Sequence, residues 1–308
     1  MSLTTAIRDP KCKAVLDPLL PEYTRNLKLS QLVAPTLPGA AHAALVGTAF
    51  DYAFRFEIER VTRTPTKRRW VAETAVALYE SIFGRDARER AARRALAAAR
   101  GYVESYVKQR SVRDRHRSEL AHHCSVLAGI DPFFRAGPAA LPFRLKPSRQ
   151  AVADVAALLA CAPVYTLLRE GRATLNPVFG TASAAIGGAD ADAIFGDLLV
   201  EIKTTRDSIV ERWMVRQLVG YALLAHAERK RDPGIPRVTR VGIYFARFAY
   251  LLVLPPITAT EQELNDASAG LLASVAPGAE PIGTAPEIRR EQLRVMFRRL
   301  AIAKAANR

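Results

Sequence analysis

The sequence predicts an α/β protein whose N-terminal half is largely helical. Up to about residue 170 the chain is rich in alanine and its apolar residues recur at helical spacing. After Gly171 the stretches become short, alternating and punctuated by glycine, which is typical of strands. A helical segment separates two such stretches, and further helices follow them. We therefore expect a central sheet flanked by helices, preceded by a mainly helical region.

The helical region begins after an irregular stretch, because residues 1–40 contain Pro10, Pro18, Pro21, Pro35 and Pro38. A break at residues 62–67 separates the first predicted helix from the second. Each later break coincides with charged, proline or glycine residues that favour helix ends. The predicted helices of this half cover residues 41–61, 70–84, 86–110, 114–127, 148–163 and 164–170.

The region after Gly171 is predicted to contain two pairs of strands with a helix between them. Gly196 and Asp197 lie between two strand-like runs, and a two-residue loop that starts with glycine suits a type II′ hairpin. The helix should run from Ser208 to about Arg229, because Ser208 and Glu211 have the spacing of a capping box. Residues 237–256 resemble two more strands, ended by Pro255 and Pro256, and helices are expected near 260–273 and 286–305.

Composition is that of an ordinary soluble protein, with 49% hydrophobic and 24% charged residues. The three cysteines, at 12, 124 and 161, lie far apart, which disfavours structural disulfides and a four-cysteine cluster. No apolar run is long enough to cross a bilayer, and the first residues lack a signal pattern. We therefore expect no membrane association and a cytoplasmic location.

Charge gives the first indication of a partner. The chain has 45 Lys and Arg residues against 30 Asp and Glu residues, a net charge of +15. Such an excess attracts polyanions, because each phosphate that a cation neutralises releases a condensed counterion. Nucleic acid is the expected partner, although a solubility bias can also produce a basic chain.

The hairpin at Gly196 brings chemically useful side chains together. If Phe195 pairs with Leu198, the register places Asp192 opposite Glu201 and Asp190 opposite Lys203, all on one face. Opposed carboxylates repel each other, and a divalent cation between them removes that penalty. Mg²⁺ prefers such oxygen ligands, with Mn²⁺ as a substitute, and Lys203 could then orient or deprotonate a water beside a phosphate. The alternative is a solvated strand face with incidental charges.

These residues resemble a known family. Asp192 followed by Glu201-Ile202-Lys203 is similar to the PD-(D/E)XK nuclease superfamily, in particular its RecB-like branch. That branch also has an upstream GxxxH motif, where this chain has Gly47 to Asp51, and a QxxxY motif, where it has Gln217 and Tyr221. The three motifs occur in the expected order. Asp51 replaces the usual histidine, and Ala191 stands where the superfamily name has proline.

The resemblance implies a restriction-endonuclease-like core and a metal-dependent nuclease acting on DNA. Asp192, Glu201 and Lys203 would be catalytic, with Asp51 completing the metal ligands. The single domain would span 1–308, with a helical elaboration at about 64–150 between the first motif helix (41–61) and the catalytic core (about 150–258). C-terminal helices would cover about 260–306. The alternatives are a catalytically inactive nucleic-acid-binding module of the same fold and an RNA-cleaving effector.

Supporting roles are open at several positions. Gln217 and Tyr221 share one helix face and would contact the DNA backbone or fix the lysine strand, or form a buried polar pair. Asp190 would pair with Lys203, or serve as a further metal ligand. A basic run would either track phosphates or form a solvated helix face. The run consists of Lys108, Arg110, Arg113, Arg115 and Arg117.

Overall fold

The chain forms two compact units in this computed structural model, which describes residues 3–64 and 69–275. Unit 1 comprises Met1–Gln31 and Pro163–Ala285, and unit 2 comprises Leu32–Ala162 with Pro286–Arg308. The helix expected at 286–305 lies outside the described residues. The helix expected to carry Asp51 belongs to unit 2, whereas the strands belong to unit 1. The domain boundaries inferred from the sequence stay a prediction.

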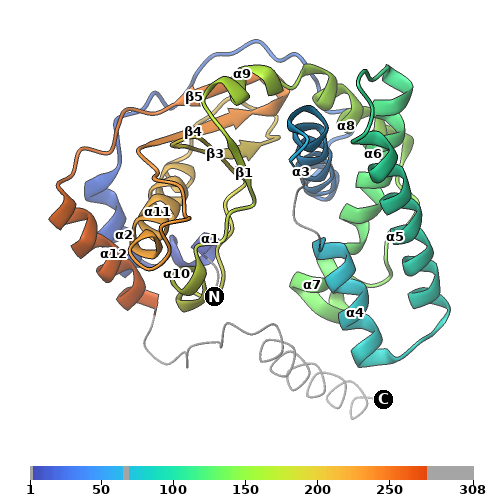
Figure 1. Cartoon of the computed structure of the whole chain (residues 1–308), viewed down its shortest axis with the longest axis horizontal. Coiled ribbons are helices and arrows are strands. Elements are labelled where there is room, and N and C mark those ends of the chain that lie inside the picture. The colour runs from blue at the N-terminus through green and yellow to red at the C-terminus, as the bar shows by residue number, and fades with distance from the viewer. Residues whose placement is uncertain (1–2, 65–68, 276–308) are drawn as a thin grey trace. The chain divides into compact units, whose positions relative to one another are not determined.

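Unit 1 is built on a mixed sheet of five strands, in the order β1-β2-β3-β4-β5 (Figure 1). Strands β3 and β4 are parallel, and every other neighbouring pair is antiparallel. The parallel pair requires a crossover, and helix α11 (Arg212–Arg229) provides it. The expected α/β sheet flanked by helices is confirmed. The strands are β1 (Ala173–Leu175), β2 (Ala193–Phe195), β3 (Leu198–Lys203), β4 (Arg240–Phe245) and β5 (Tyr250–Val253).

The core of unit 1 lies between one sheet face and a layer of helices. Leu199 and Ile243 from the sheet pack in the same cluster as Leu218 of α11, and none of them is exposed. The N-terminal segment joins this cluster through Leu3 and Cys12, although about 160 residues separate Cys12 from the first strand. Four shorter helices complete the layer (Figure 1): α1 (Leu3–Ala6), α2 (Pro10–Leu16), α10 (Gly180–Ala185) and α12 (Glu261–Val275).

Two details of unit 1 differ from the sequence-based expectation. Helix α11 begins at Arg212 and not at Ser208, because residues 208–210 pair with the N-terminal segment. Asn26 and Ile209 form an antiparallel bridge, and the Ser208 hydroxyl accepts a hydrogen bond from the main-chain N–H of Leu29 at 3.3 Å. Part of the expected strand region, residues 180–185, is the short helix α10.

Unit 2 is helical in its described residues, as the sequence predicts. The longest helix, α3, lies beside α6 and α8 (Figure 1), and it ends at Thr62, before Arg63, whose φ of 59° is left-handed. Asp86 and Ser148 cap the helices that follow them, each accepting a main-chain N–H three residues on. The helices are α3 (Ala40–Thr62), α4 (Val71–Phe83), α5 (Ala87–Tyr106), α6 (Asp114–Ile130), α7 (Pro132–Ala136) and α8 (Arg149–Cys161).

No helix within residues 3–64 and 69–275 combines the length and the apolar character that crossing a bilayer requires.

Candidate active site

The β2–β3 hairpin has the register that the sequence predicts. Phe195 pairs with Leu198, and Ala193 pairs with Val200. Gly196 adopts a φ of 62°, which glycine tolerates and other residues rarely adopt. A Cβ at Gly196 would lie 2.4 Å from the carbonyl oxygen of Glu170, so the turn excludes a side chain for a second reason. The glycine therefore fixes the position of every residue that follows on β3.

Asp192 lies just before β2, outside the β2–β3 pairing, but its side chain is hydrogen-bonded to β3. Its main-chain oxygen accepts a hydrogen bond from the Asn176 N–H at 2.9 Å, while its carboxylate Oδ2 accepts one from the Ile202 N–H at 2.7 Å. Ile202 lies between Glu201 and Lys203 in the strand. The structure therefore brings the Asp192 carboxylate to the segment that carries the other two predicted catalytic residues.

Asp190 does not pair with Lys203, contrary to the expected register. The segment before β2 pairs instead with the residues that follow β1: the Asn176 N–H donates to the Asp192 carbonyl, and the Ala191 N–H donates to the Pro177 carbonyl. Asp190 then forms an isolated antiparallel bridge with Val178 and is exposed. Pairing of Asp190 with Lys203 would need the β2–β3 ladder to continue three residues beyond Ala193, where it stops.

Lys203 is directed toward polar partners by the alternation of β3. Leu199, Glu201 and Lys203 share one strand face, and Leu199 packs in the α11 side of the core. The Lys203 Nζ lies 2.8 Å from Glu201 Oε1 and 3.3 Å from Gln217 Oε1. The Glu201 and Lys203 side chains are only 8% and 13% exposed, so the ion pair is largely shielded from water.

Gln217 and Tyr221 connect α11 to this ion pair. Both residues are buried, one helical turn apart on the same helix face. The Gln217 side-chain oxygen accepts from Lys203, while its Nε2 donates to the Tyr221 hydroxyl at 3.1 Å. The same Nε2 lies 3.4 Å from the hydroxyl of Thr4 in α1. The two residues thus form a buried polar pair that also contacts the Lys203 ammonium, and their functional role stays a prediction.

The negative charges of nearby carboxylates act on the Tyr221 phenol. Burial raises the pKa of the Tyr221 phenol well above its ordinary value, and the negative charges of Glu201 and Asp192 raise it further. The charge of Asp190 acts in the same direction with a smaller effect. Tyr221 therefore stays protonated at any physiological pH, and it is a permanent hydrogen-bond donor beside the acidic groups.

Trp213 is a neighbour of Lys203 that the sequence did not single out. Its indole ring centroid lies 5.0 Å from the Lys203 Nζ, within the range of a cation–π interaction. Trp213 is 39% exposed, which is unusual for tryptophan. The sequence contains one indication of this position. Trp213 precedes Gln217 by four residues on a predicted helix, and residues at that spacing share one helix face.

Asp51 lies on α3 in unit 2, where it forms an ion pair with Arg55. The Asp51 Oδ2 is 2.5 Å from the Arg55 Nη2, at the i,i+4 spacing of a helix. The Arg55 guanidinium also lies over the Tyr52 ring, 4.7 Å from its centroid. The role of Asp51 as a metal ligand stays a prediction.

The donor set of unit 1 suits a cation that needs few protein ligands. No group of three or more His, Cys, Asp or Glu side chains is arranged to hold a metal within the described part of the chain. Mg²⁺ commonly takes only one or two carboxylates and completes its coordination with water and phosphate oxygens. Asp192 and Glu201 supply two carboxylates, and with Lys203 they carry a net charge of −1. These residues fit Mg²⁺ by charge and by ligand type.

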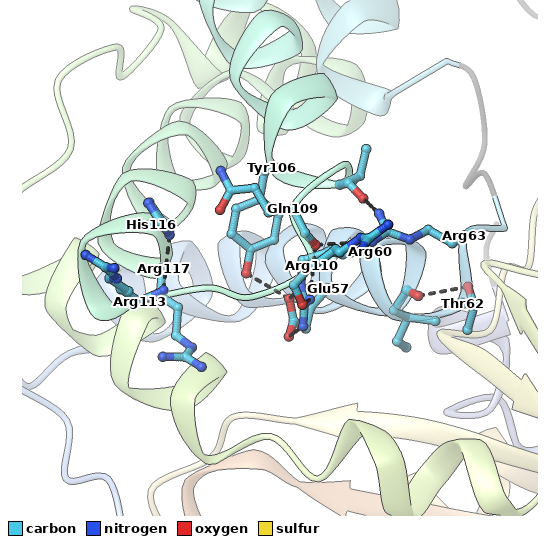
Figure 2. Close-up of polar contacts among 12 residues, drawn as sticks. Glu57, Arg60, Thr62, Arg63, Tyr106, Gln109, Arg110, Arg113, His116 and Arg117 are labelled. Carbon is cyan, nitrogen blue, oxygen red and sulfur yellow. Dashed lines mark hydrogen bonds and ion pairs between the residues drawn. The ribbon is translucent and has the colours of Figure 1, made fainter.

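The predicted basic run lies in unit 2, between α5 and the first turn of α6. Four of its five cationic residues are exposed, and Arg117 is half-buried and paired with Asp114 at 2.9 Å. Figure 2 shows the main chain of this connection against α3. Helix α5 ends at Tyr106 and not at residue 110 as expected, so Lys108 and Arg110 lie in the connection between the two helices.

Comparison of the chain with protein-family models, with curated proteins and with solved structures found no match.

Proposed function

We propose that the chain is a metal-dependent nuclease that hydrolyses phosphodiester bonds, with DNA as its substrate and Mg²⁺ as its cofactor. The observation that carries the proposal is the gathering of Asp192, Glu201 and Lys203 at one end of the β2–β3 hairpin. Two carboxylates and an ammonium in shielded surroundings are what phosphodiester hydrolysis requires, since charge develops on the phosphate as the bond breaks.

Each residue has a role that follows from its contacts. Asp192 and Glu201 would hold the metal, which supplies charge neutralisation and an acidified water when bound. Lys203 Nζ, kept in place by Glu201 and Gln217, would position a water or a non-bridging phosphate oxygen by donating hydrogen bonds. Nζ could accept a proton from the water only after losing one of its own.

Gln217 and Tyr221 would act as positioning residues. Gln217 spans the distance from the Tyr221 hydroxyl to the Lys203 ammonium, so α11 sets the direction in which the ammonium points. The parallel β3 and β4 with α11 as their crossover support our proposal of a restriction-endonuclease-like core of the RecB-like type. The catalytic strand and the glutamine helix are then adjacent elements of one crossover unit.

The test is cleavage of labelled linear, circular and single-stranded DNA, and of RNA, with Mg²⁺, with Mn²⁺ and with EDTA. We expect cleavage of DNA that requires the metal and falls at least about a hundredfold in Lys203→Ala. Lys230→Ala is the matched control, because it removes an exposed lysine of the same unit. A Lys203→Ala variant that cuts at the wild-type rate would contradict the site, and RNA cleavage alone would contradict the substrate.

A further inference from the structure

The connection between α5 and α6 is fixed to α3 through its main chain. The Arg60 Nη1 donates to the carbonyl oxygens of Gln109 and Arg110 at 3.4 and 3.3 Å (Figure 2). Arg63 donates to the carbonyl of Val107 and, at 3.3 Å, to that of Gln109. The guanidinium groups of Arg60 and Arg63 thus hold the main-chain carbonyl groups of three residues, which lie in a segment without helix or strand. The three residues are Val107, Gln109 and Arg110.

The Arg60 guanidinium is itself held in a buried network. It makes two hydrogen bonds to the Glu57 carboxylate, at 2.7 and 2.8 Å. The Tyr106 hydroxyl donates to the same carboxylate at 2.8 Å. Burial raises the pKa of the Tyr106 phenol, and the charge of Glu57 raises it further, so the hydroxyl remains a donor. Two parallel hydrogen bonds to one carboxylate require the planar guanidinium fork of arginine, and the lysine ammonium cannot reproduce them.

The far end of the connection is fixed as well. The His116 Nδ1 accepts from the Arg113 N–H at 3.1 Å, which satisfies a main-chain donor at the start of α6. The Tyr102 hydroxyl of α5 donates to the His116 carbonyl at 2.9 Å. We call residues 107–117 the basic loop; it is held by α3 at one end and by α5 at the other.

Whereas the main chain of the basic loop is fixed, five of its side chains are cationic, and most of these are exposed. The loop has five Lys and Arg residues and one acidic residue, Asp114, which pairs with Arg117. The exposed cations are Lys108, Arg110, Arg113 and Arg115. Its aromatic content is limited to His116, whose ring nitrogens contact Arg113 and Arg115.

We infer that the basic loop binds the sugar-phosphate backbone of duplex DNA without regard to base sequence. A loop whose main chain is already ordered loses little conformational freedom on binding, so its cations contribute more of their attraction to affinity. Single-stranded binders use exposed aromatic side chains as stacking platforms, and the basic loop presents none. The inference concerns binding by unit 2 and does not depend on hydrolysis in unit 1.

The experiment is titration of the full chain against labelled duplexes of two unrelated sequences, in EDTA, over a series of salt concentrations. For the Lys108→Ala, Arg110→Ala, Arg113→Ala triple variant, we expect weaker binding to both sequences. The slope of log K against log salt should fall by about 0.9 for each phosphate contact removed.

The matched control removes equal charge from the same unit. Arg88, Arg90 and Arg94 are exposed on α5, and the basic loop follows the other end of this 20-residue helix. Arg94, the nearest of the three to the loop, lies twelve residues before the end of α5, about 18 Å along the helix axis and beyond the Debye length of about 10 Å. The triple alanine variant of these residues should retain most of the wild-type slope. An equal loss of slope in both variants would overturn the inference.

Substitutions that conserve charge separately test the buried network of Glu57, Arg60 and Tyr106, which we call the clamp. Arg60→Lys keeps the cation but loses the fork, and Tyr106→Phe removes only the hydroxyl. Both should weaken duplex binding several-fold by the same factor at every salt concentration, because the number of phosphate contacts is unchanged. Thermal melts check that each variant folds. Unchanged affinity in folded variants would overturn the role of the clamp, and tighter binding to single strands or to polyglutamate would overturn the duplex assignment.

Discussion

The ion pair between Lys203 and Glu201 makes the substitution Lys203→Met informative. Two unit charges 2.8 Å apart attract by about 6 kcal/mol at an effective dielectric constant of about 20. Desolvation offsets much of this attraction, and removal of one partner from a buried pair typically destabilises a protein by about 3–5 kcal/mol. Because the two side chains retain slight exposure, we expect the lower end, about 3 kcal/mol. The melting temperature without metal should fall by roughly 6–12 °C.

Mg²⁺ should reverse part of this loss. In the wild type the ammonium already neutralises Glu201, so a cation that binds there must compete with it. In Lys203→Met the carboxylates keep their charge, and a metal bound only to the native state adds about 2.7 kcal/mol at a hundredfold excess over its Kd. The rise in melting temperature between EDTA and Mg²⁺ should therefore be larger in Lys203→Met than in the wild type.

The control for this prediction is the double variant with Asp192→Asn. Asparagine retains an oxygen that can accept the Ile202 N–H, so the strand contact survives while a ligand charge is lost. The double variant should lose most of the Mg²⁺-dependent gain. An equal or smaller Mg²⁺ shift in Lys203→Met than in the wild type would refute the assignment of Glu201 to the metal.

Three further predictions follow from the same unit. Gly196→Ala should destabilise by at least about 2 kcal/mol in denaturant titrations, because of its positive φ and the Glu170 carbonyl 2.4 Å from the added Cβ; no change would show that the turn can relax. Hydrogen bonding from Arg240 lowers the pKa of Asp197 from 3.8 to about 2, so its contribution is present above pH 3.8 and is lost as the pH falls toward 2. The stability difference between the wild type and Asp197→Asn should be constant at neutral pH and shrink in that acid window, and at 38% exposure it should be about 1 kcal/mol or less. Trp213→Ala should lower the cleavage rate more than Trp213→Phe, since phenylalanine keeps a ring beside the Lys203 ammonium; equal rates for all three proteins would remove Trp213 from the site.

The hairpin register could be predicted from sequence because the turn determines it. Gly196 admits a conformation that few residues can adopt, and alternation then assigns every neighbour on β3 to a face. The gathering of Asp192, Glu201 and Lys203 follows from those local rules. The position of Asp190 does not, because the main chain of residues 190–192 pairs with residues 176–178, beyond β1, and not with β3.

Long-range pairing also explains the error at Ser208. The spacing of Ser208 and Glu211 satisfies a local rule for helix starts, but the Ser208 hydroxyl accepts from Leu29 instead. The basic loop shows the same limit. Its charges are visible in the sequence, whereas the buried contacts of Glu57 and Arg60 that hold it come from a helix some fifty residues earlier.

The two segments of unit 1 have a consequence for the order of events during synthesis. Leu3 and Cys12 are fully buried against side chains that include Leu218 and Leu271, and Cys12 Sγ contacts the Ser274 hydroxyl at 3.0 Å. The first segment therefore emerges from the ribosome long before its partners exist, while all of 32–162 emerges as one continuous stretch. Domains generally fold as units as they leave the ribosome. Residues 32–162, the continuous part of unit 2, can thus fold first, and the N-terminal segment must keep its apolar side chains from premature association until the sheet is complete.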